Sequence, residues 1–108
     1  MLQQSAQLDA IYHALADAGR RAMLDRLSRG PATVSELAAP LDMTLSAVVQ
    51  HLKMLETSGL VTTEKVGRVR TCLMDPKALS LAEKWLRERR TLWHRRLGDA
   101  PASDPGGK

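Results

Sequence analysis

The sequence has almost no aromatic residues and a single cysteine. Phenylalanine is absent, and aromatic residues make up 3% of the 108 residues, so the core must be built from Leu, Val, Ala and Met. One cysteine excludes an internal disulfide framework and favours a reduced, cytoplasmic protein. No stretch approaches the roughly 20 apolar residues of a membrane span, and the N-terminal residues do not show the pattern of a secretory signal.

Catalytic motifs are also missing. The sequence contains no G-x-S-x-G element, no glycine-rich phosphate loop and no pair of carboxylates in a plausible pocket. The chain is therefore not expected to be an enzyme. Its length suits one domain, which we place at residues 1–98, followed by a flexible tail at residues 99–108 that is rich in Pro, Gly, Ser and Asp.

Positive charge is concentrated in the second half of the chain. Residues 1–60 hold five basic and six acidic side chains, whereas residues 61–108 hold eleven basic and six acidic ones, and the net charge is +4. A basic half indicates a polyanionic partner, with nucleic acid as the first candidate. The alternative is an arginine-rich helix face that is simply solvated.

Apolar spacing and capping signals predict five helices. The T-x-x-E pattern from Thr33 to Glu36 is a capping box that opens a short third helix, which must end near Pro40. Thr44 and Gly59 are the expected start and stop signals of the fourth helix. A short helix joined to another by a tight turn predicts a helix-turn-helix. We expect the other helices at about residues 5–18, 20–29 and 76–97, and the fourth at residues 45–58.

A β-hairpin is predicted directly after the fourth helix. Residues 60–65 and 69–74 are rich in β-prone side chains, and Gly67 lies between them as a turn residue. Asp75 and Pro76 then restart a helix as its N-cap and first position. The predicted fold is mainly α with a small β-hairpin: a winged helix-turn-helix of five helices plus a wing.

The fourth helix shows an outer face without carboxylates. At 100° per residue, Val48, Leu52 and Leu55 face the core, and the opposite side carries short or flexible polar side chains. Such a face suits the DNA major groove, where phosphates flank the base edges. The alternatives are an ordinary solvated face or a protein–protein interaction module. The predicted DNA-binding residues here are Thr44, Leu45, Ser46, Val49, Gln50 and Lys53.

The hairpin adds three predicted DNA-binding cations: Lys65, Arg68 and Arg70. They suit contacts with the phosphate backbone or the minor groove, which add affinity more than sequence choice. The alternative is that they only keep an exposed sheet edge soluble.

The first and last helices carry more apolar surface than one small domain can cover. A second copy of the chain is the simplest way to bury it, so we expect a homodimer with two fourth helices about 34 Å apart, one DNA turn. The operator is then an inverted repeat. The arginine-rich side of the last helix is expected to be solvated, with Glu83 and Glu88 as local ion-pair partners. The predicted interface residues are Leu8, Ile11, Tyr12, Leu15, Leu81, Trp85, Leu86, Leu92 and Trp93.

These elements resemble a known family. The run TVSELAAPLDMTLSAVVQHLKMLETSGLV, followed by GRVRTCLMDPKAL and WLRERRTLWHRRL, is similar to the ArsR-type winged-helix repressors of bacteria, over roughly Tyr12 to Leu97. It looks most similar to the metal-independent branch often associated with START-like domain proteins. The resemblance implies a homodimer, with the first and last helices in the interface, that represses transcription by binding operator DNA.

Two departures from that branch concern the DNA face and the dimer seam. Over residues 44–52 the chain reads TLSAVVQHL where the branch usually reads SLPAVSKHL, so Val49 replaces Ser and Gln50 replaces a basic residue. We expect the fold to be kept and the operator sequence to differ. The chain also leaves the usual helical continuation after Leu97, which we expect to shorten the seam.

Metal ligands are sparse. Many relatives sense metals through paired cysteines on the third helix, but residues 34–39 hold no Cys or His, and His94 is alone on the last helix. Cys72 is alone in the hairpin, and the four ligands of tetrahedral zinc cannot be assembled within one chain. We therefore expect no metal and no cofactor. A metal-responsive repressor with an intersubunit site is the alternative, and the sequence names no small-molecule effector.

Overall fold

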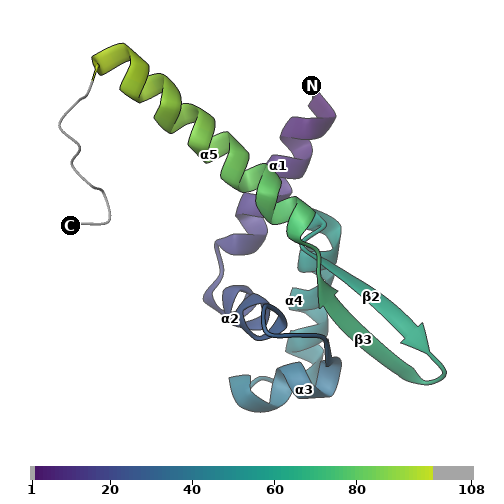
Figure 1. Cartoon of the computed structure of the whole chain (residues 1–108). Coiled ribbons are helices and arrows are strands. Elements are labelled where there is room, and N and C mark those ends of the chain that lie inside the picture. Colours follow the sequence, from purple (N-terminus) through teal and green to yellow (C-terminus); the bar gives the residue numbers. More distant parts are fainter. Residues whose placement is uncertain (1, 99–108) are drawn as a thin grey trace.

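The computed structural model describes residues 2–98, and the side chains from Ala6 onward. The predicted flexible tail at residues 99–108, and the shortened seam after Leu97, lie outside this range. Figure 1 shows the predicted winged helix-turn-helix, with its five helices and hairpin wing, which is confirmed. The elements are α1 (Leu2–Leu15), α2 (Ala18–Leu27), β1 (Ala32–Thr33), α3 (Val34–Ala38), the 3-10 turn η1 (Ala39–Leu41), α4 (Leu45–Ser58), β2 (Val61–Val66), β3 (Val69–Met74) and α5 (Pro76–Leu97).

The junction of α1 and α2 differs from the prediction. Asp17 has an extended backbone, and its carboxylate accepts a hydrogen bond from the backbone N–H of Arg20, so it caps α2 instead of merely ending α1. As a result α1 ends at Leu15, and Ala18 and Gly19 belong to α2. The predicted ranges 5–18 and 20–29 were wrong at this junction, because a capping residue also looks like a helix breaker in sequence.

The capping box of α3 is present. The backbone N–H of Glu36 donates to Thr33 Oγ1 at 3.2 Å, and the Glu36 carboxylate accepts from the backbone N–H of Thr33 at 2.8 Å. Pro40 follows in η1, where the chain tightens into a 3-10 turn instead of extending α3. α3 is therefore short because Pro40 cannot continue it, as the sequence predicts.

The bounds of α4 match the prediction. Asp42 adopts a left-handed conformation (φ 52°), which short polar side chains tolerate, and so lets the chain turn sharply between η1 and α4. The hydroxyl of Thr44 then accepts from the backbone N–H of Ala47 at 3.1 Å and caps the helix. Gly59, with φ of 85°, ends it and directs the chain into β2.

The sheet has three strands, not two. β2 and β3 form the predicted antiparallel hairpin, with Gly67 at positive φ in its turn. The two-residue strand β1 pairs with the other side of β3, Ala32 opposite Cys72 and Thr33 opposite Thr71, so the strand order is β1-β3-β2. A strand of two residues shows no alternation in sequence, which explains why it was not predicted.

One hydrophobic core joins the helices to the base of the wing. α4 lies at its centre and packs against α1, α2, α3 and β2. The stripe of Val48, Leu52 and Leu55 is buried, as predicted. The largest fully buried side chains elsewhere are Ile11, Met23, Leu37, Leu60, Val61 and Cys72.

Only the first turns of α5 pack on this core. Ala78 and Ala82 are buried, and the hydroxyl of Tyr12 on α1 donates to the carbonyl oxygen of Ala82 at 2.8 Å. Figure 1 shows the second half of α5 running away from the rest of the molecule. Within residues 2–98 no helix combines the length and apolar character needed to cross a membrane.

The capping box should make stability depend on pH. The hydrogen bond from the Thr33 backbone N–H lowers the pKa of Glu36 below its ordinary value of 4.5. A carboxyl whose pKa is lowered by folding stabilises the fold above the unfolded pKa, and this contribution is lost as pH falls through the folded pKa. Glu36→Gln keeps an acceptor oxygen but removes the titration.

We therefore expect wild type to be more stable than Glu36→Gln near neutral pH, and the difference to vanish in acid. Urea unfolding at about pH 7 and about pH 3 measures it. Glu83→Gln on the exposed side of α5 controls for the loss of one negative charge. An equal difference between wild type and Glu36→Gln at both pH values would contradict the prediction.

Candidate nucleic-acid interface

The predicted DNA-binding residues of α4 all reach solvent. Ser46, Gln50 and Lys53 are exposed on the side opposite the buried stripe, and Val49 beside them is 40% exposed. Thr44 and Leu45, at the start of the helix, are exposed as well. All six predicted side chains are therefore accessible, and the surface formed by Ser46, Val49, Gln50 and Lys53 is called here the outer face of α4.

The outer face carries no carboxylate. Glu56 is the only acidic residue of α4, and its Oε2 accepts a hydrogen bond from the Thr63 hydroxyl of β2 at 3.0 Å. The carboxylate is therefore turned toward the wing and partly buried. Lys53 leaves the outer face neutral to positive, which is the condition for a close approach to phosphates.

Two cations of the wing stand side by side. Lys65 of β2 and Arg70 of β3 are direct partners in the antiparallel register, so their side chains share one face of the hairpin. It is the face of Thr63, the residue that bonds α4. Like charges directly opposite each other are destabilising, and an anion between them would relieve the repulsion. The wing therefore carries two neighbouring cations on the face from which Thr63 bonds α4, and neither forms an ion pair within residues 6–98.

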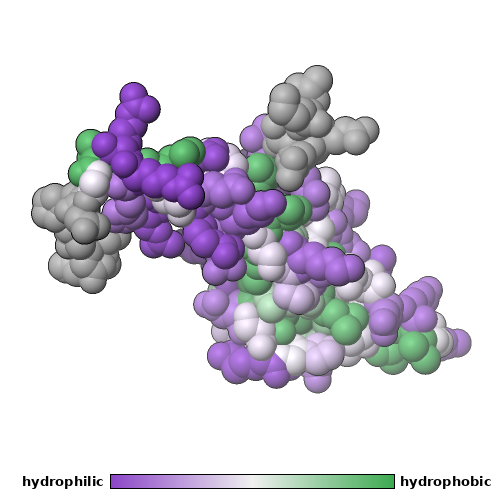
Figure 2. Space-filling view, turned by 45° about the horizontal axis from the view of Figure 1, so that its top comes forward, coloured by the Kyte–Doolittle hydropathy of each residue, from purple (hydrophilic) through white to green (hydrophobic). Residues whose placement is uncertain are grey.

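The tip of the wing adds Arg68 in the turn. A shallow groove of about 350 Å³ runs between β3 and the start of α3, and Arg68, Arg70 and Ser35 line it. Val66 and Val69 at the tip are 76% and 52% exposed, and Figure 2 shows hydrophobic side chains at the end of the wing. The sequence pattern assigns Val69 to a strand and leaves Val66 in the turn, and it predicts neither as an exposed apolar side chain.

The predicted dimer residues lie elsewhere. Figure 1 places α3 and the wing at one end of the molecule and the free half of α5 at the other. Figure 2 shows hydrophobic side chains interrupting the hydrophilic surface of that free half. The exposed fractions are 39% for Trp85, 53% for Leu86, 54% for Leu92 and 60% for Trp93.

On α1 the dimer prediction needs one correction. Ile11 is 0% exposed within a single chain, so it has no surface left to offer to a second copy. Leu8, Tyr12 and Leu15, from the same apolar stripe, are only partly buried, as is Leu81 on α5. Tyr12 also meets Trp85 edge to face, with ring centroids 6.3 Å apart.

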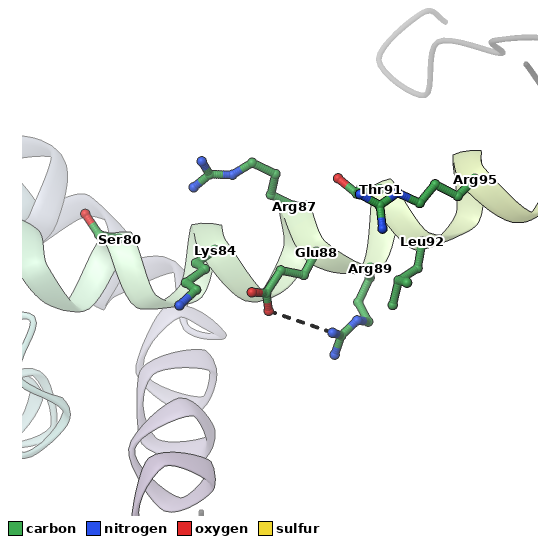
Figure 3. A pocket seen from close by; sticks show the side chains of 8 residues that line it. All are labelled: Ser80, Lys84, Arg87, Glu88, Arg89, Thr91, Leu92 and Arg95. Atoms are coloured by element: carbon green, nitrogen blue, oxygen red, sulfur yellow. Dashed lines mark ion pairs between the residues drawn. The ribbon is translucent and has the colours of Figure 1, made fainter.

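Four cations of α5 line a shallow groove along that helix (Figure 3): Lys84, Arg87, Arg89 and Arg95. Glu88 lies 3.8 Å from Arg89, which confirms one of the two expected ion-pair partners, but Glu83 forms no ion pair within residues 6–98. The Arg89 guanidinium also lies over the Trp85 ring, 4.8 Å from its centroid. Arg89 thus covers part of an otherwise exposed aromatic surface.

Cys72 is a buried core residue. Burial raises the pKa of its thiol, with a smaller contribution from the nearby Glu56 carboxylate, so the thiol stays protonated at neutral pH. A protonated thiol is a poor nucleophile and a poor metal ligand. Among the described residues, no group of three or more His, Cys, Asp or Glu side chains could hold a metal ion.

Comparison with known proteins identifies the family. Residues 17–63 match the family model "Bacterial regulatory protein, arsR family". A crystal structure of an ArsR family transcriptional regulator is 52% identical, with 83% of this chain and 93% of that chain covered and a TM-score of 0.78. The chain belongs to the ArsR family.

Two further proteins are similar to this chain. The HTH-type transcriptional regulator Rv2034 of Mycobacterium tuberculosis is 44% identical over 72 residues, 67% of each chain. The homodimeric winged helix-turn-helix DNA-binding domain of Mb0332 from Mycobacterium bovis is 26% identical, with 86% of this chain and 85% of that chain covered and a TM-score of 0.63. These relatives are transcriptional regulators, not enzymes, and this ArsR-family chain is a DNA-binding regulator of transcription.

The cations of the wing generate a salt-dependent prediction. Arg68→Ala should weaken binding to all duplexes alike and make the slope of log affinity against log salt shallower by about one, because one phosphate contact is lost. Fluorescence anisotropy at several salt concentrations measures the slope. Arg87→Ala, which removes the same charge from exposed α5, should leave it unchanged. Equal slopes for wild type and Arg68→Ala would remove this wing residue from the interface.

Proposed function

We propose that this ArsR-family chain is a homodimeric repressor that binds an inverted-repeat operator through α4 and the wing. The observation that carries the proposal is the outer face of α4. It is exposed and carboxylate-free, and Glu56, the one acidic side chain of the helix, is bonded to Thr63 on the wing. An ordinary solvated helix face mixes Glu with Lys.

Each residue of the outer face has a role in base recognition. Gln50 can bond adenine through both its amide oxygen and nitrogen, and Lys53 can reach guanine or a phosphate. Val49 supplies an apolar contact for a thymine methyl group, and Ser46 can bond several base edges. Thr44 and Leu45 lie at the helix start, where the chain enters the major groove. Gln50 makes adenine the expected base at its position.

The wing supplies affinity instead of sequence choice. Lys65, Arg68 and Arg70 hold the sugar-phosphate backbone beside the groove that α4 occupies, and the Lys65–Arg70 pair gains most because a phosphate relieves its internal repulsion. The groove between β3 and α3 follows the same side of the wing and offers the Ser35 hydroxyl to the same strand.

A second copy of the chain covers the free half of α5. Trp85, Leu86, Leu92 and Trp93 are too exposed for a stable monomer surface, and Leu8, Tyr12 and Leu15 extend the apolar surface onto α1. The homodimeric state of the similar domain of Mb0332 supports the same arrangement. A twofold dimer would present two α4 helices about 34 Å apart, one turn of DNA.

We assign the chain to the metal-independent branch of the family. The lack of Cys and His over residues 34–39 and the buried, protonated thiol of Cys72 support this assignment. A metal site built between two subunits is the alternative. Since it acts on the bacterial chromosome, the regulator works in the cytoplasm.

Selection of bound duplexes from a random pool tests the proposed function. We expect an enriched inverted repeat whose half-sites lie one helical turn apart, and the same repeat with and without a chelator. Loss of binding in chelator would support the intersubunit metal site. Failure to retain any duplex at low salt would refute DNA binding by this chain.

Gln50 variants test base recognition on the selected operator. Gln50→Ala should lose about 1–3 kcal/mol of discrimination at one base pair, while its affinity for scrambled DNA stays close to that of wild type. Gln50→Glu should bind neither duplex well, because it places a carboxylate among phosphates. Titration of cognate, single-mismatch and scrambled duplexes measures both effects. Unchanged discrimination in Gln50→Ala would contradict a base contact there.

Trp93→Asp tests the dimer. A charge buried without a partner in the seam costs several kcal/mol, so sedimentation should show a monomer near 11.9 kDa in place of a dimer. Thr91→Asp, on the polar side of the same helix turn, should remain dimeric. A wild-type protein that sediments as a monomer over the concentrations used for DNA binding would overturn the interface.

A further inference from the structure

A cluster of polar side chains joins α1, α2 and α4. At its centre is Arg20, in the first turn of α2, which is 9% exposed and is the only buried charged side chain within residues 6–98. A guanidinium cannot be neutralised by losing its proton, so it persists in such a place only with its N–H groups bonded. The hydrogen-bond acceptors of its N–H groups therefore show which parts of the fold Arg20 holds together.

Those acceptors belong to the two helices on either side. Arg20 Nε donates to the carbonyl oxygen of Ala14 at 2.8 Å, and Nη2 donates to that of His13 at 3.0 Å, so the side chain caps the last turn of α1. Nη1 lies 3.5 Å from Nδ1 of His51 on α4. Because a guanidinium can only donate, the imidazole nitrogen is the acceptor.

Asp17 completes the cluster from the junction between α1 and α2. Its Oδ2 accepts from the backbone N–H of Arg20 at 3.0 Å and lies 3.8 Å from His51 Nδ1. The hydrogen bond from the Arg20 backbone lowers the pKa of Asp17 below its ordinary value of 3.8, so the carboxylate is charged at neutral pH. The cluster therefore joins the backbone of Arg20 to Asp17 and its guanidinium to acceptors on α1 and α4.

The first turn of α2 also leaves no spare room beside α4. A Cβ atom at Gly19 would lie 3.0 Å from Asp17 Oδ2, 3.0 Å from the terminal methyl group of Met43 and 3.4 Å from His51 Nε2. The first two distances are shorter than ordinary van der Waals contact, and the third is at its lower limit. A side chain at position 19 would therefore displace Asp17 or Met43, and the first turn of α2 lies in contact with the imidazole of α4.

The position of His51 connects this cluster to DNA recognition. His51 directly follows Gln50 in α4, and Arg20 ties it to the end of α1, the helix whose Leu8 and Tyr12 belong to the proposed dimer surface. Hydrophobic contacts are non-directional and tolerate small slides and rotations of a helix. A hydrogen bond weakens steeply when its angle changes, so it resists both movements.

We propose that Arg20 and His51 are positioning residues that fix α4 relative to α1, and thereby the distance and twist between the two α4 helices of the dimer. The proposal rests on the proposed dimeric operator binding. It assigns the choice of half-site spacing to a contact inside each protomer, made by residues that belong neither to the outer face of α4 nor to the proposed dimer surface.

Operators with altered spacing test this role. Each inserted base pair moves one half-site by about 3.4 Å and turns it by about 34° relative to the other. A dimer with fixed α4 helices can follow only by deforming the DNA, so wild type should lose on the order of tenfold in affinity per inserted pair. Anisotropy titrations on the native operator, on spaced variants and on one isolated half-site measure this.

His51→Leu removes the acceptor for Arg20 Nη1. We expect its spacing preference to fall to about twofold, while its affinity for the isolated half-site stays within about twofold of wild type. His51→Gln restores an acceptor oxygen and should restore the preference. His94→Leu, the same substitution on exposed α5, should behave as wild type. A purely structural role would weaken binding to every duplex alike and would leave the preference intact.

Circular dichroism and thermal unfolding establish that each variant is folded. If His51→Leu does not fold, Arg20→Lys decides instead, because an ammonium group cannot reach all three acceptors; it should relax the preference in the same way. A folded His51→Leu or Arg20→Lys protein that keeps the wild-type spacing preference overturns the proposal, as does a wild type without any preference. A wild type that binds no duplex at all refutes the proposed function itself.

Discussion

The structure depends on the burial of one side, and only one side, of α4. Val48, Leu52 and Leu55 are almost completely excluded from solvent, and each such side chain contributes about 1.5–3 kcal/mol relative to exposure. Rotating the helix by one position would expose this stripe and bury Lys53 and Glu56. The packing of the core therefore decides which side chains can meet DNA, before any of them makes a contact.

On α5, in contrast to α4, much of the apolar side is not buried within one chain. Its first turns use the small residues Ala78 and Ala82 to approach the core closely, but the helix continues past the end of the domain with its apolar side unchanged. Arg89 partly covers Trp85, which limits the aromatic surface left in water. The same helix thus closes the core of one chain and leaves an apolar surface that a single chain of this size cannot cover.

Local signals predicted much of the molecule. Thr44 and Gly59 bracket α4 correctly because caps act within one turn, and the exposure of Gln50 and Lys53 follows from helical periodicity alone. Local signals failed where the deciding contact is distant. Ile11 shares its stripe with Tyr12, and periodicity cannot tell a side chain that enters its own core from one that faces outward. The sequence does not predict the pairing of β1 with β3 either, because the two strands are far apart along the chain.

The link from Arg20 to His51 spans 31 residues, and no local pattern signals it. Its chemistry is also costly, because a buried guanidinium gives up several kcal/mol of hydration that its hydrogen bonds only offset. An apolar side chain of similar size could join α1, α2 and α4 through packing alone, but it would not resist the small slides and rotations of α4 that oriented hydrogen bonds resist. Arg20 donates to three oriented acceptors, one of them on α4. A helix that must meet bases in one register requires this loss of freedom, and a helix that only fills a core does not.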